Sequence, residues 1–591
     1  EKSYGKKGPE IVQKNITTID MALEGVEKVD YPKTATSKLK MHPAIAGDAP
    51  EFVKNVLGKV AIQKGDDIRV SEMPEDGTFP TATTQYEKRA IAEHIPIWKS
   101  DICIQCGQCV MVCPHACIRM KAYDGSLLAK APQGFKSCDY KGKEFEGAKF
   151  TIQVSSEDCT GCGLCVQQCP AKSKENPEIK AINMESFVEH RAVESENWNF
   201  FMSLPDPDTR KVNLSQPKGL GFKRPLFEFS GACAGCGETA YIGLISQMFG
   251  DRAVIANATG CSSIYGGNLP STPYAKDASG RGPAWSNSLF EDAAEFGMGM
   301  CLTGDKLSEY AREVASSVKE KGIAANLIEE ILANAQGDDA AIVQQRADID
   351  ALKKELASSK EPAAQELLSL TDHLLKRSHW IIGGDGWAYD IGYGGLDHVL
   401  ASGRNINVLV MDTEVYSNTG GQMSKATQIG AIAKFAASGK ETSKKDLGMM
   451  AMSYGYVYVA QVSMGANMSQ VIKAFREAES YDGPSIIIAY SHCINHGINM
   501  TKGMSNQKEA VTCGLWPLYR YDPRLTDQGK NPFQLDSKEP DFNLADFMYK
   551  EVRFKSLKNA NPERAQMLLD KAVAKAKRRW QEYKYLADRP F

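Results

Sequence analysis

Short apolar segments alternate with segments of helical periodicity between about residues 227 and 520. The apolar segments are rich in β-branched residues and run into polar or glycine-containing loops, which is typical of buried strands. These segments are Ala253–Ala256, Trp380–Ile382, Val408–Met411, Tyr456–Val462 and Ile486–Ala489. Because strands separated by helices pair in parallel, the pattern predicts an α/β domain with a doubly wound parallel sheet over residues 227–520.

The remaining sequence divides by composition and periodicity. Apolar residues at helical spacing, including Ile11, Ile16 and Leu23, predict an N-terminal helix that closes a preceding domain. Charged amphipathic segments interrupt the α/β region and predict a helical insertion. The predicted divisions are a helix within 1–30, a connecting arm at 31–95, a small domain at 96–205, a Pro-containing linker at 206–226, the insertion at 302–376, and a C-terminal extension at 521–591 ending in a basic helix near 565–583.

Composition narrows the class of protein. The chain has 591 residues, enough for at least three domains. A formal net charge of −3 gives no electrostatic reason to expect nucleic acid as a partner. No apolar run is long enough for a membrane span, and no signal peptide is visible, so we expect a cytoplasmic protein with reduced thiols. Because the chain begins at Glu1 within charged sequence, we expect a piece of a longer polypeptide.

Two cysteine runs dominate residues 96–205. Each has the spacing C-x2-C-x2-C-x3-C followed by proline, which is the pattern of proteins that hold two [4Fe–4S] clusters. In that pattern the fourth cysteine of each run binds the other cluster. The predicted ligand sets are Cys103, Cys106, Cys109 and Cys169 for one cluster, and Cys159, Cys162, Cys165 and Cys113 for the other. A zinc site or disulfides fit less well, because each run has three evenly spaced thiols. We therefore predict a small α+β ferredoxin-like domain.

A second motif follows a strand in the α/β region. Gly384-Asp385-Gly386 comes after the strand Trp380–Ile382, and the polar segment 412–421 follows the next strand. Ligands of such sheets bind beyond the carboxyl ends of the strands. Carboxylate and hydroxyl oxygens suit Mg²⁺, and glycines let the backbone approach phosphates. A lone Gly-Asp-Gly could be a simple turn. With the second polar turn it predicts a Mg²⁺-diphosphate site.

This arrangement resembles the thiamine diphosphate fingerprint, and one departure narrows the family. The usual Asn-Asn pair is replaced by Asp412-Thr413, as in the pyruvate:ferredoxin oxidoreductases. Tyr86-Glu87-Lys88-Arg89 is similar to the short arm that precedes the two-cluster domain in that family. The resemblance implies Asp385 and Thr413 as side-chain Mg²⁺ ligands, the Val415 carbonyl as a third ligand, and Asn418 as the catalytic residue facing the reacting carbon. The cofactor-binding residues that it implies are Glu238, Cys261, Gly384, Asp385, Gly386, Trp387, Thr413, Glu414, Val415, Tyr416, Ser417 and Asn418.

The resemblance also implies a third [4Fe–4S] cluster beside the thiamine. Its ligands would be Cys233, Cys236, Cys261 and Cys493, of which the last two follow predicted strands. Taken alone, Cys261 or Cys493 would be read as a small buried hydrophobic residue. The chain would then hold three clusters, with four thiols left as ordinary buried or partly exposed residues. Those four are Cys117, Cys138, Cys301 and Cys513.

Several candidates have a plain alternative. Glu238 could be a carboxylate favoured by a helix N-terminus instead of a cofactor contact. His492 and His496 could act as acid or base, but a supporting hydrogen bond to the cluster or phosphate is the stronger expectation. Tyr416 and Trp387 could wall the thiazolium ring or belong to the core.

The function that the resemblance implies is oxidative decarboxylation of pyruvate to acetyl-CoA and CO₂. Electrons would pass through the three clusters to ferredoxin or flavodoxin, as suits clusters of low potential. This chain would be the C-terminal half of a single-chain enzyme and a homodimer. The upstream half would supply the coenzyme A site and the carboxylate that activates the aminopyrimidine. Two alternatives stay open: a related oxidoreductase acting on 2-oxoglutarate or indolepyruvate, and a non-catalytic electron-transfer subunit.

Overall fold

The computed structural model describes residues 4–5, 8–37 and 45–590. The chain forms two compact units, residues 1–44 and 45–591. In the first unit, α1 (Pro9–Glu24) is a helix in which no residue is buried, and Leu23 is 82% exposed. The predicted N-terminal helix is therefore present. That its apolar face closes a preceding domain stays a prediction, as do the predicted domain bounds.

Within the predicted arm, residues 45–93 form a series of short helical turns. These are η2 (Val53–Leu57), α2 (Gly58–Ala61), η3 (Gly65–Asp67), η4 (Val70–Glu72) and η5 (Thr83–Tyr86). The last turn is hydrogen-bonded to the α/β domain: the Ala82 amide donates to the Tyr274 carbonyl at 2.7 Å, and the Thr84 hydroxyl donates to the Glu228 carbonyl at 2.9 Å. This end of the arm is thus an integral part of the second unit. Residues 38–44 of the predicted arm lie outside the described residues.

The cysteine-rich region is a small α+β domain, as predicted. Each cysteine run contains a short helix, and two small antiparallel sheets pack beside the runs. A three-stranded sheet in the order β2-β4-β3 lies between the runs in sequence. The elements are β1 (His94–Trp98), α3 (Gln108–Met111), β2 (Ile118–Tyr123), η6 (Gly125–Lys130), β3 (Cys138–Asp139), β4 (Lys149–Val154), α4 (Leu164–Gln168), β5 (Ile182–Ser186) and α5 (Phe187–Ser203). Two short turns, η7 (Thr209–Lys211) and α6 (Pro217–Leu220), lead to the α/β domain.

The α/β domain is built on an eight-stranded sheet in the order β13-β12-β10-β11-β9-β8-β6-β7. All five predicted strands are present and lie parallel to one another. The strands are β6 (Ala253–Ala258), β7 (Ala284–Ser288), β8 (Ser378–Gly383), β9 (Asn407–Asp412), β10 (Tyr458–Val462), β11 (Ser485–Tyr490), β12 (Tyr519–Tyr521) and β13 (Phe533–Leu535). The predicted fold class is confirmed for this central part.

One edge of the sheet differs from the predicted parallel arrangement, because its two outer strands are antiparallel. β12 pairs antiparallel with β10, and β13 pairs antiparallel with β12. β13 lies in the segment predicted as a C-terminal extension, so that segment completes the sheet. Antiparallel neighbours need only a short connection, here the turn η11 (Pro523–Gln528), whereas parallel neighbours need a crossover.

Helices cover both faces of the sheet, which is the doubly wound arrangement. Ile486 and Ile488 of β11 belong to the apolar core on one face, and Ile487 and Ala489 belong to the core on the other. Alternate residues of a strand point to opposite faces, so both faces of β11 are buried. The covering helices and turns are α7 (Thr239–Phe249), α8 (Cys261–Gly266), α13 (Asp385–Tyr389), α14 (Tyr393–Ala401), α15 (Leu447–Met452), α16 (Met468–Ser480), η9 (Ile494–His496), η10 (Met500–Lys502), α17 (Gly503–Thr512), α18 (Leu544–Met548), α19 (Val552–Ala560) and α20 (Pro562–Asp588).

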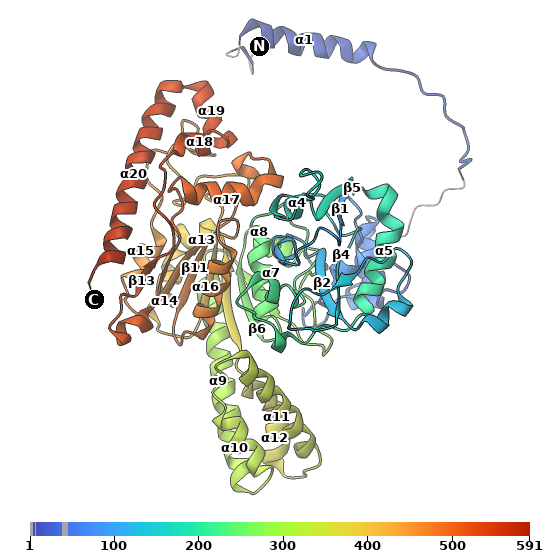
Figure 1. Ribbon diagram of the computed structural model, residues 1–591, viewed down its shortest axis with the longest axis vertical. Helices are drawn as coiled ribbons and strands as arrows, with labels where there is room; N and C mark the ends of the chain where they lie inside the picture. The colour runs from blue at the N-terminus through green and yellow to red at the C-terminus, as the bar shows by residue number, and fades with distance from the viewer. Residues whose placement is uncertain (1–3, 6–7, 38–44, 591) are drawn as a thin grey trace. The chain divides into compact units, whose positions relative to one another are not determined.

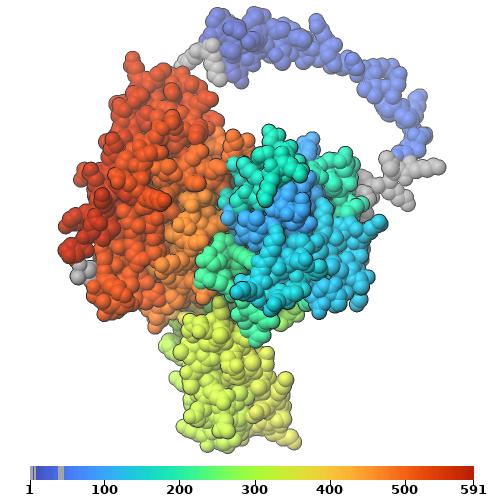
Figure 2. Space-filling model, in the orientation of Figure 1, coloured from blue at the N-terminus to red at the C-terminus, as the bar shows by residue number. Residues whose placement is uncertain are grey.

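The predicted helical insertion forms a lobe that projects from the α/β domain (Figures 1 and 2). The lobe has its own apolar core, which includes Ile331, Leu352 and Leu367. Its elements are α9 (Ala293–Glu320), α10 (Ala325–Ala333), α11 (Asp339–Ala357), α12 (Pro362–Leu370) and η8 (Thr371–Leu374). The first turns of α9 pack on the sheet through Ala293 and Ala294, so α9 belongs to both parts. Among the helices of the described ranges, none combines the length and apolar character needed to cross a membrane.

Candidate functional site

Three oxygen atoms converge at the carboxyl ends of β8 and β9. Asp385 starts α13 directly after β8, and Thr413 follows β9, its parallel neighbour. The Thr413 amide donates to Asp385 Oδ1 at 3.1 Å. Thr413 Oγ1 lies 3.5 Å from Asp385 Oδ1 and 3.0 Å from the Val415 carbonyl oxygen. The structure thus brings together the three predicted Mg²⁺ ligands, whose donors are all oxygen, the type that Mg²⁺ prefers.

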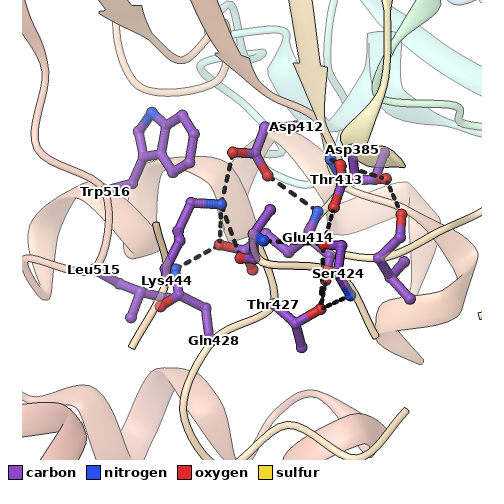
Figure 3. A network of polar contacts seen from close by, with 12 residues as sticks. Asp385, Asp412, Thr413, Glu414, Ser424, Thr427, Gln428, Lys444, Leu515 and Trp516 are labelled. Carbon is purple, nitrogen blue, oxygen red and sulfur yellow. Dashed lines mark hydrogen bonds and ion pairs between the residues drawn. The ribbon is translucent and has the colours of Figure 1, made fainter. Parts of the chain in front are cut away.

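The charges around this triad favour a cation. Burial, and then repulsion from Asp412, raises the pKa of Asp385 well above its usual value. Its other carboxylate oxygen accepts a hydrogen bond from Ser424 Oγ at 2.9 Å, which brings no positive charge. The connected network (Figure 3) holds more negative than positive groups. The buried carboxylates of this region are Asp385, Asp412, Glu414 and Glu551, and its buried cations are Lys440, Lys444 and Arg553; Figure 3 labels Asp385, Asp412, Glu414 and Lys444. A divalent cation at the triad would offset this excess, because an unpaired buried charge is costly.

Glu414 lies between Thr413 and Val415, and its side-chain contacts hold this segment in place. Its backbone has φ = 61°, a left-handed conformation that a residue with a side chain rarely adopts. Its carboxylate accepts hydrogen bonds from Arg553 at 2.7 Å and Gln428 at 2.6 Å. Burial acts to raise the pKa of Glu414, but Arg553 and Lys444 hold it at about 2. Glu414 was predicted as a cofactor contact, yet it points into this buried network and does not line the neighbouring cavity.

That cavity lies beside the oxygen triad and is lined by most of the predicted cofactor residues. They are Glu238, Cys261, Gly384, Asp385, Gly386, Trp387, Val415, Tyr416, Ser417 and Asn418. Sequence reasoning missed five further lining residues: Thr259, Gly260, Ser262, Phe290 and Thr419. Thr259 and Gly260 follow β6, a predicted strand parallel to β8, so their position at the end of that strand was a usable signal. Phe290 carried no such signal.

Aromatic residues form one wall of the cavity. The Tyr416 ring lies so close to Gly386 that a Cβ atom at that glycine would be 2.3 Å from the ring. Tyr416 also packs edge-to-face against Phe290, with ring centroids 6.4 Å apart. Trp387 is fully buried, and its indole nitrogen has no hydrogen-bond partner in the structure. Both sequence alternatives hold for Trp387, since it lies in the core and also borders the cavity.

Glu238 places a protonatable group in the cavity. It precedes α7 and accepts a hydrogen bond from the Tyr265 hydroxyl at 2.8 Å. Burial raises the pKa of Glu238 to about 7, although the Tyr265 hydrogen bond acts in the opposite direction. The side chain is only slightly accessible and borders the same cavity as Cys261. Its position fits a contact with a bound group better than a simple role at the helix N-terminus.

The four cysteines predicted for a third cluster are neighbours. Cys261 follows β6, Cys493 follows β11, and Cys236 precedes α7. Burial raises the pKa of Cys261 above its usual range, with added repulsion from Glu238 and then from the Cys493 and Cys233 thiols. Burial likewise raises the pKa of Cys236, with a contribution from Cys493. These mutual effects require short separations between thiols that lie far apart in the sequence.

Two polar residues connect this cysteine set to the cavity. Ser417 Oγ lies 3.1 Å from Cys261 Sγ. The Asn495 amide nitrogen lies 3.6 Å from Cys493 Sγ and donates to the Ser417 carbonyl at 3.2 Å. The segment that ends the oxygen triad is therefore held directly against the cysteine set.

The fourth cysteine of the second run lies near thiols of the first run; that these four bind one cluster stays a prediction. Burial raises the pKa of Cys109 well above its usual value, and the nearby Cys106, Cys103 and Cys169 thiols add to the rise. Cys169 comes from the second run, and the structure places it with three thiols of the first.

The second set is arranged in the same way. Burial raises the pKa of Cys165, and Cys162, Cys113 and Cys159 contribute as neighbouring charges. Backbone amides of Gln105 and Gly161 donate to the thiols of Cys103 and Cys159 at 3.3 and 3.4 Å. Hydrogen bonds of this kind tune the potential of a bound cluster.

Within the described residues, no three His, Cys, Asp or Glu side chains are close enough together to hold a single metal ion. Four thiols around a cube of four iron atoms stand further apart than four around one ion. The donor chemistry, all thiol and partly buried, therefore fits clusters better than zinc.

One glycine connects the cysteine set of the α/β domain to the second ferredoxin-type set. Gly235 lies between Cys233 and Cys236 and has φ = 78°. Burial raises the pKa of Cys162 to about 11, while backbone hydrogen bonds from Leu164 and Gly235 act to lower it. A Cβ atom on Gly235 would lie 3.6 Å from the Cys162 Cβ and 3.0 Å from the Met500 Cβ. The close contact thus needs glycine here.

The two histidines near Cys493 hold backbone loops in place. His492 Nε2 is 2.9 Å from the Gly235 carbonyl, and His496 Nε2 is 2.7 Å from the Thr413 carbonyl. Burial lowers the pKa of His492 to about 4 and that of His496 to about 3, so both are neutral at pH 7. Neutral imidazoles donate one hydrogen bond to these carbonyls. Both side chains therefore support the site and do not line the cavity.

Comparison with known families agrees with this geometry. Residues 102–173 match a 4Fe-4S dicluster domain, and residues 368–489 match the C-terminal TPP binding domain of thiamine pyrophosphate enzymes. Residues 38–92 match the EKR domain, described as a domain of unknown function. The chain is therefore an iron–sulfur protein with a thiamine diphosphate-binding domain.

Curated relatives resemble the chain along its whole length. The chain is 56% identical over its whole length to pyruvate-flavodoxin oxidoreductase of Trichormus variabilis and 55% identical to that of Nostoc sp., covering 50% of each. It is 52% identical to pyruvate:ferredoxin oxidoreductase of Moorella thermoacetica, with 99% of the chain and 50% of the relative aligned. The chain is thus similar to pyruvate-flavodoxin and pyruvate:ferredoxin oxidoreductases and spans about half the length of these relatives.

Proposed function

We propose that this chain is the C-terminal half of an enzyme that converts pyruvate and coenzyme A to acetyl-CoA and CO₂. Two electrons would pass to a ferredoxin or flavodoxin. The observation that carries the proposal is that Asp385 of the oxygen triad and Cys261 of the third cysteine set border one cavity. A site for diphosphate chemistry and a site for electron acceptance therefore lie next to each other, as an oxidative decarboxylation requires.

The residues of the triad bind and orient the cofactor. Asp385 and Thr413 side chains and the Val415 carbonyl would hold Mg²⁺, and Gly384 leaves room for phosphate oxygens, whereas the space beside Gly386 is taken by the Tyr416 ring. Thiamine diphosphate, when bound, supplies a carbon nucleophile and an electron sink. Tyr416 would border its ring, and Asn418 would face the reacting carbon from the rim of the cavity.

The cysteines provide three sites for one-electron transfer. The proposed third set is Cys233, Cys236, Cys261 and Cys493, in addition to the two sets of the dicluster domain. The Gly235–Cys162 contact supports a direct route between the third set and the second ferredoxin-type set. Amide N–H groups at Cys103, Cys159 and Cys493 would stabilise the reduced state of a bound cluster.

The other half of the longer protein would supply what these residues do not. That half would carry the coenzyme A site and the carboxylate that activates the aminopyrimidine. The resemblance to these enzymes also suggests a homodimer. We expect it in the cytoplasm, with no nucleic acid or membrane as a partner.

The test is an anaerobic assay of the full-length protein with pyruvate, coenzyme A and either ferredoxin or flavodoxin. We expect coenzyme A-dependent reduction of the carrier with pyruvate, and little with 2-oxoglutarate or indolepyruvate. Residues 1–591 alone should bind thiamine diphosphate but reduce no carrier at a useful rate. Stronger activity with another 2-oxo acid would favour the related enzymes. Absence of stoichiometric thiamine binding would favour the electron-transfer subunit.

A further inference from the structure

Two positively charged residues are buried on one face of β2 in the dicluster domain. Arg119 and Lys121 are two positions apart, so their side chains point to the same side of the strand. Only 5% of the Arg119 side chain and 9% of the Lys121 side chain are exposed. Such a strand needs counter-charges or hydrogen-bond acceptors for both groups, because buried charge without them is unfavourable.

Acceptors within the protein satisfy these groups only in part. Arg119 Nη2 pairs with the buried carboxylate of Glu228, and Arg119 Nε donates to a backbone carbonyl at 3.0 Å. Arg224 shares the same carboxylate at 3.8 Å. Arg119 Nη1 and Arg224 Nε are both buried and have no hydrogen-bond partner in the structure. One carboxylate therefore serves two guanidinium groups, and two N–H donors are left over.

A cavity opens beside these two arginines. Its lining includes Arg119, Lys121, Lys223 and Arg224, and its only carboxylate is Asp206, which is half-exposed and paired with Lys121 at 2.9 Å. Phe201, Met202 and Phe222 add apolar wall. Burial lowers the pKa of Lys121, and the neighbouring Arg224 and Arg119 add to this effect while Asp206 opposes it. The Lys223 ammonium points elsewhere and donates to the Met248 carbonyl at 3.2 Å. The cavity shares no residue with the one at Asp385.

We propose that this cavity binds a small oxyanion, a phosphate or carboxylate group, through the unused N–H groups of Arg119 and Arg224. Guanidinium groups match the geometry of carboxylate and phosphate oxygens. The cavity is formed by β2, the end of α5 and the segment 221–225 that enters the α/β domain. A bound anion would therefore join the dicluster domain to that segment.

The test is calorimetric titration of the cluster-loaded protein with inorganic phosphate and, separately, with acetate. Saturating Mg²⁺ and thiamine diphosphate fill the other anion site, and sodium chloride at equal ionic strength is the reference titration. We expect saturable binding of one or both oxyanions and none of chloride. Arg224→Gln should weaken binding roughly tenfold or more, because its guanidinium supplies a donor. Comparison of the two titrations distinguishes a phosphate site from a carboxylate site.

Arg210→Gln is the matched control, because Arg210 is exposed, pairs with Asp208 and does not line this cavity. It should bind as the unaltered protein does. A second variant, Met202→Glu, places a carboxylate in the cavity and should abolish binding while the clusters remain. Heats equal to those of chloride, or unchanged affinity in Arg224→Gln, would overturn the proposal and leave the cavity to water alone.

Discussion

Arg553 of α19 forms a buried ion pair with Glu414, at 2.7 Å, across 139 positions of the sequence. Glu414 stands between Thr413 and Val415, two residues of the oxygen triad, and its backbone is in the left-handed region. Strained conformations of this kind persist only where surrounding contacts enforce them. The C-terminal segment, which lies beyond the matched thiamine-binding region at 368–489, therefore helps to shape the proposed Mg²⁺ site.

Replacing Arg553 by Met should weaken Mg²⁺-dependent thiamine diphosphate binding roughly 10- to 100-fold, the usual effect of losing a residue that supports a metal ligand. Removing Arg553 alone leaves Glu414 with only Lys444 as a nearby cation, at 3.7 Å, and leaves the buried Glu551 without its ion-pair partner, at a cost of roughly 3–5 kcal/mol in unfolding free energy. The double variant Arg553→Met/Glu414→Gln removes one of these two carboxylates and should recover part of the stability but not the affinity. Fluorescence titration with the cofactor and thermal unfolding measure the two effects.

The control for this experiment is Arg564→Gln. Arg564 pairs with Glu441 on the surface, so both stability and cofactor affinity should stay close to those of the unaltered protein. A folded double variant that binds the cofactor as tightly as the unaltered protein would show that the Glu414 backbone holds its conformation without Arg553.

Asp385→Asn should abolish Mg²⁺-dependent binding of thiamine diphosphate and leave the clusters in place. Asp385 is the only carboxylate of the oxygen triad, and Asn keeps its shape without its charge. Equilibrium dialysis with Mg²⁺ measures the binding, and EPR spectra of the reduced protein report on the clusters. Asp397→Asn is a suitable control, because Asp397 accepts hydrogen bonds from Tyr393 and Tyr454 and does not line the cavity. Binding within a few-fold of normal in Asp385→Asn would contradict the Mg²⁺ assignment.

Features that depend on short sequence motifs could be predicted from the sequence alone. The cysteine runs and Gly384-Asp385-Gly386 are compact motifs, and the five parallel strands are continuous apolar segments because both of their faces are buried. Cys261 and Cys493 could be joined to Cys233 and Cys236 only by resemblance, since their proximity arises from strand order.

Other features depend on contacts that no local pattern records. β12 and β13 have three residues each, too few to show alternation, and β12 contains Arg520. The antiparallel edge of the sheet was therefore missed. Glu414 looked like a cofactor contact because it lies within the motif, but its partner Arg553 is distant in the sequence and turns the side chain into the interior. Pairings over such separations are fixed by the fold as a whole.

Lys440 should give the protein a stability that rises with pH in the alkaline range. Burial, and then repulsion from Lys444, lowers the pKa of Lys440 to about 8. The unfolded chain, where the amine keeps its ordinary pKa near 10.5, therefore binds more protons than the folded one between those values. Below pH 8 the buried, protonated amine lowers the free energy of unfolding. As the pH rises from about 8 toward 10.5 the folded protein loses this charge, and the free energy of unfolding increases by on the order of 1 kcal/mol per pH unit at most. Lys440→Met should flatten this slope in thermal unfolding between about pH 7.5 and 9.5. Lys508→Met, at a residue outside this network, should keep it. An unchanged slope in Lys440→Met would assign the titration to another group.

Cys493→Ser should remove the third cluster and leave the two ferredoxin-type clusters. Cys493 Sγ accepts hydrogen bonds from the backbone and side-chain amides of Asn495, and its set shares no thiol with the other two. Anaerobic iron and sulfide analysis should therefore fall from about 12 to about 8 iron atoms per chain, four for each [4Fe–4S] cluster. Cys513→Ser is the matched control, because Cys513 is also a buried thiol but its Sγ donates to the Ala510 carbonyl, apart from every predicted ligand set. It should retain all the iron. Loss of all three EPR signals together in Cys493→Ser would contradict the grouping of ligands, and full iron content in that variant would show that no third cluster depends on Cys493.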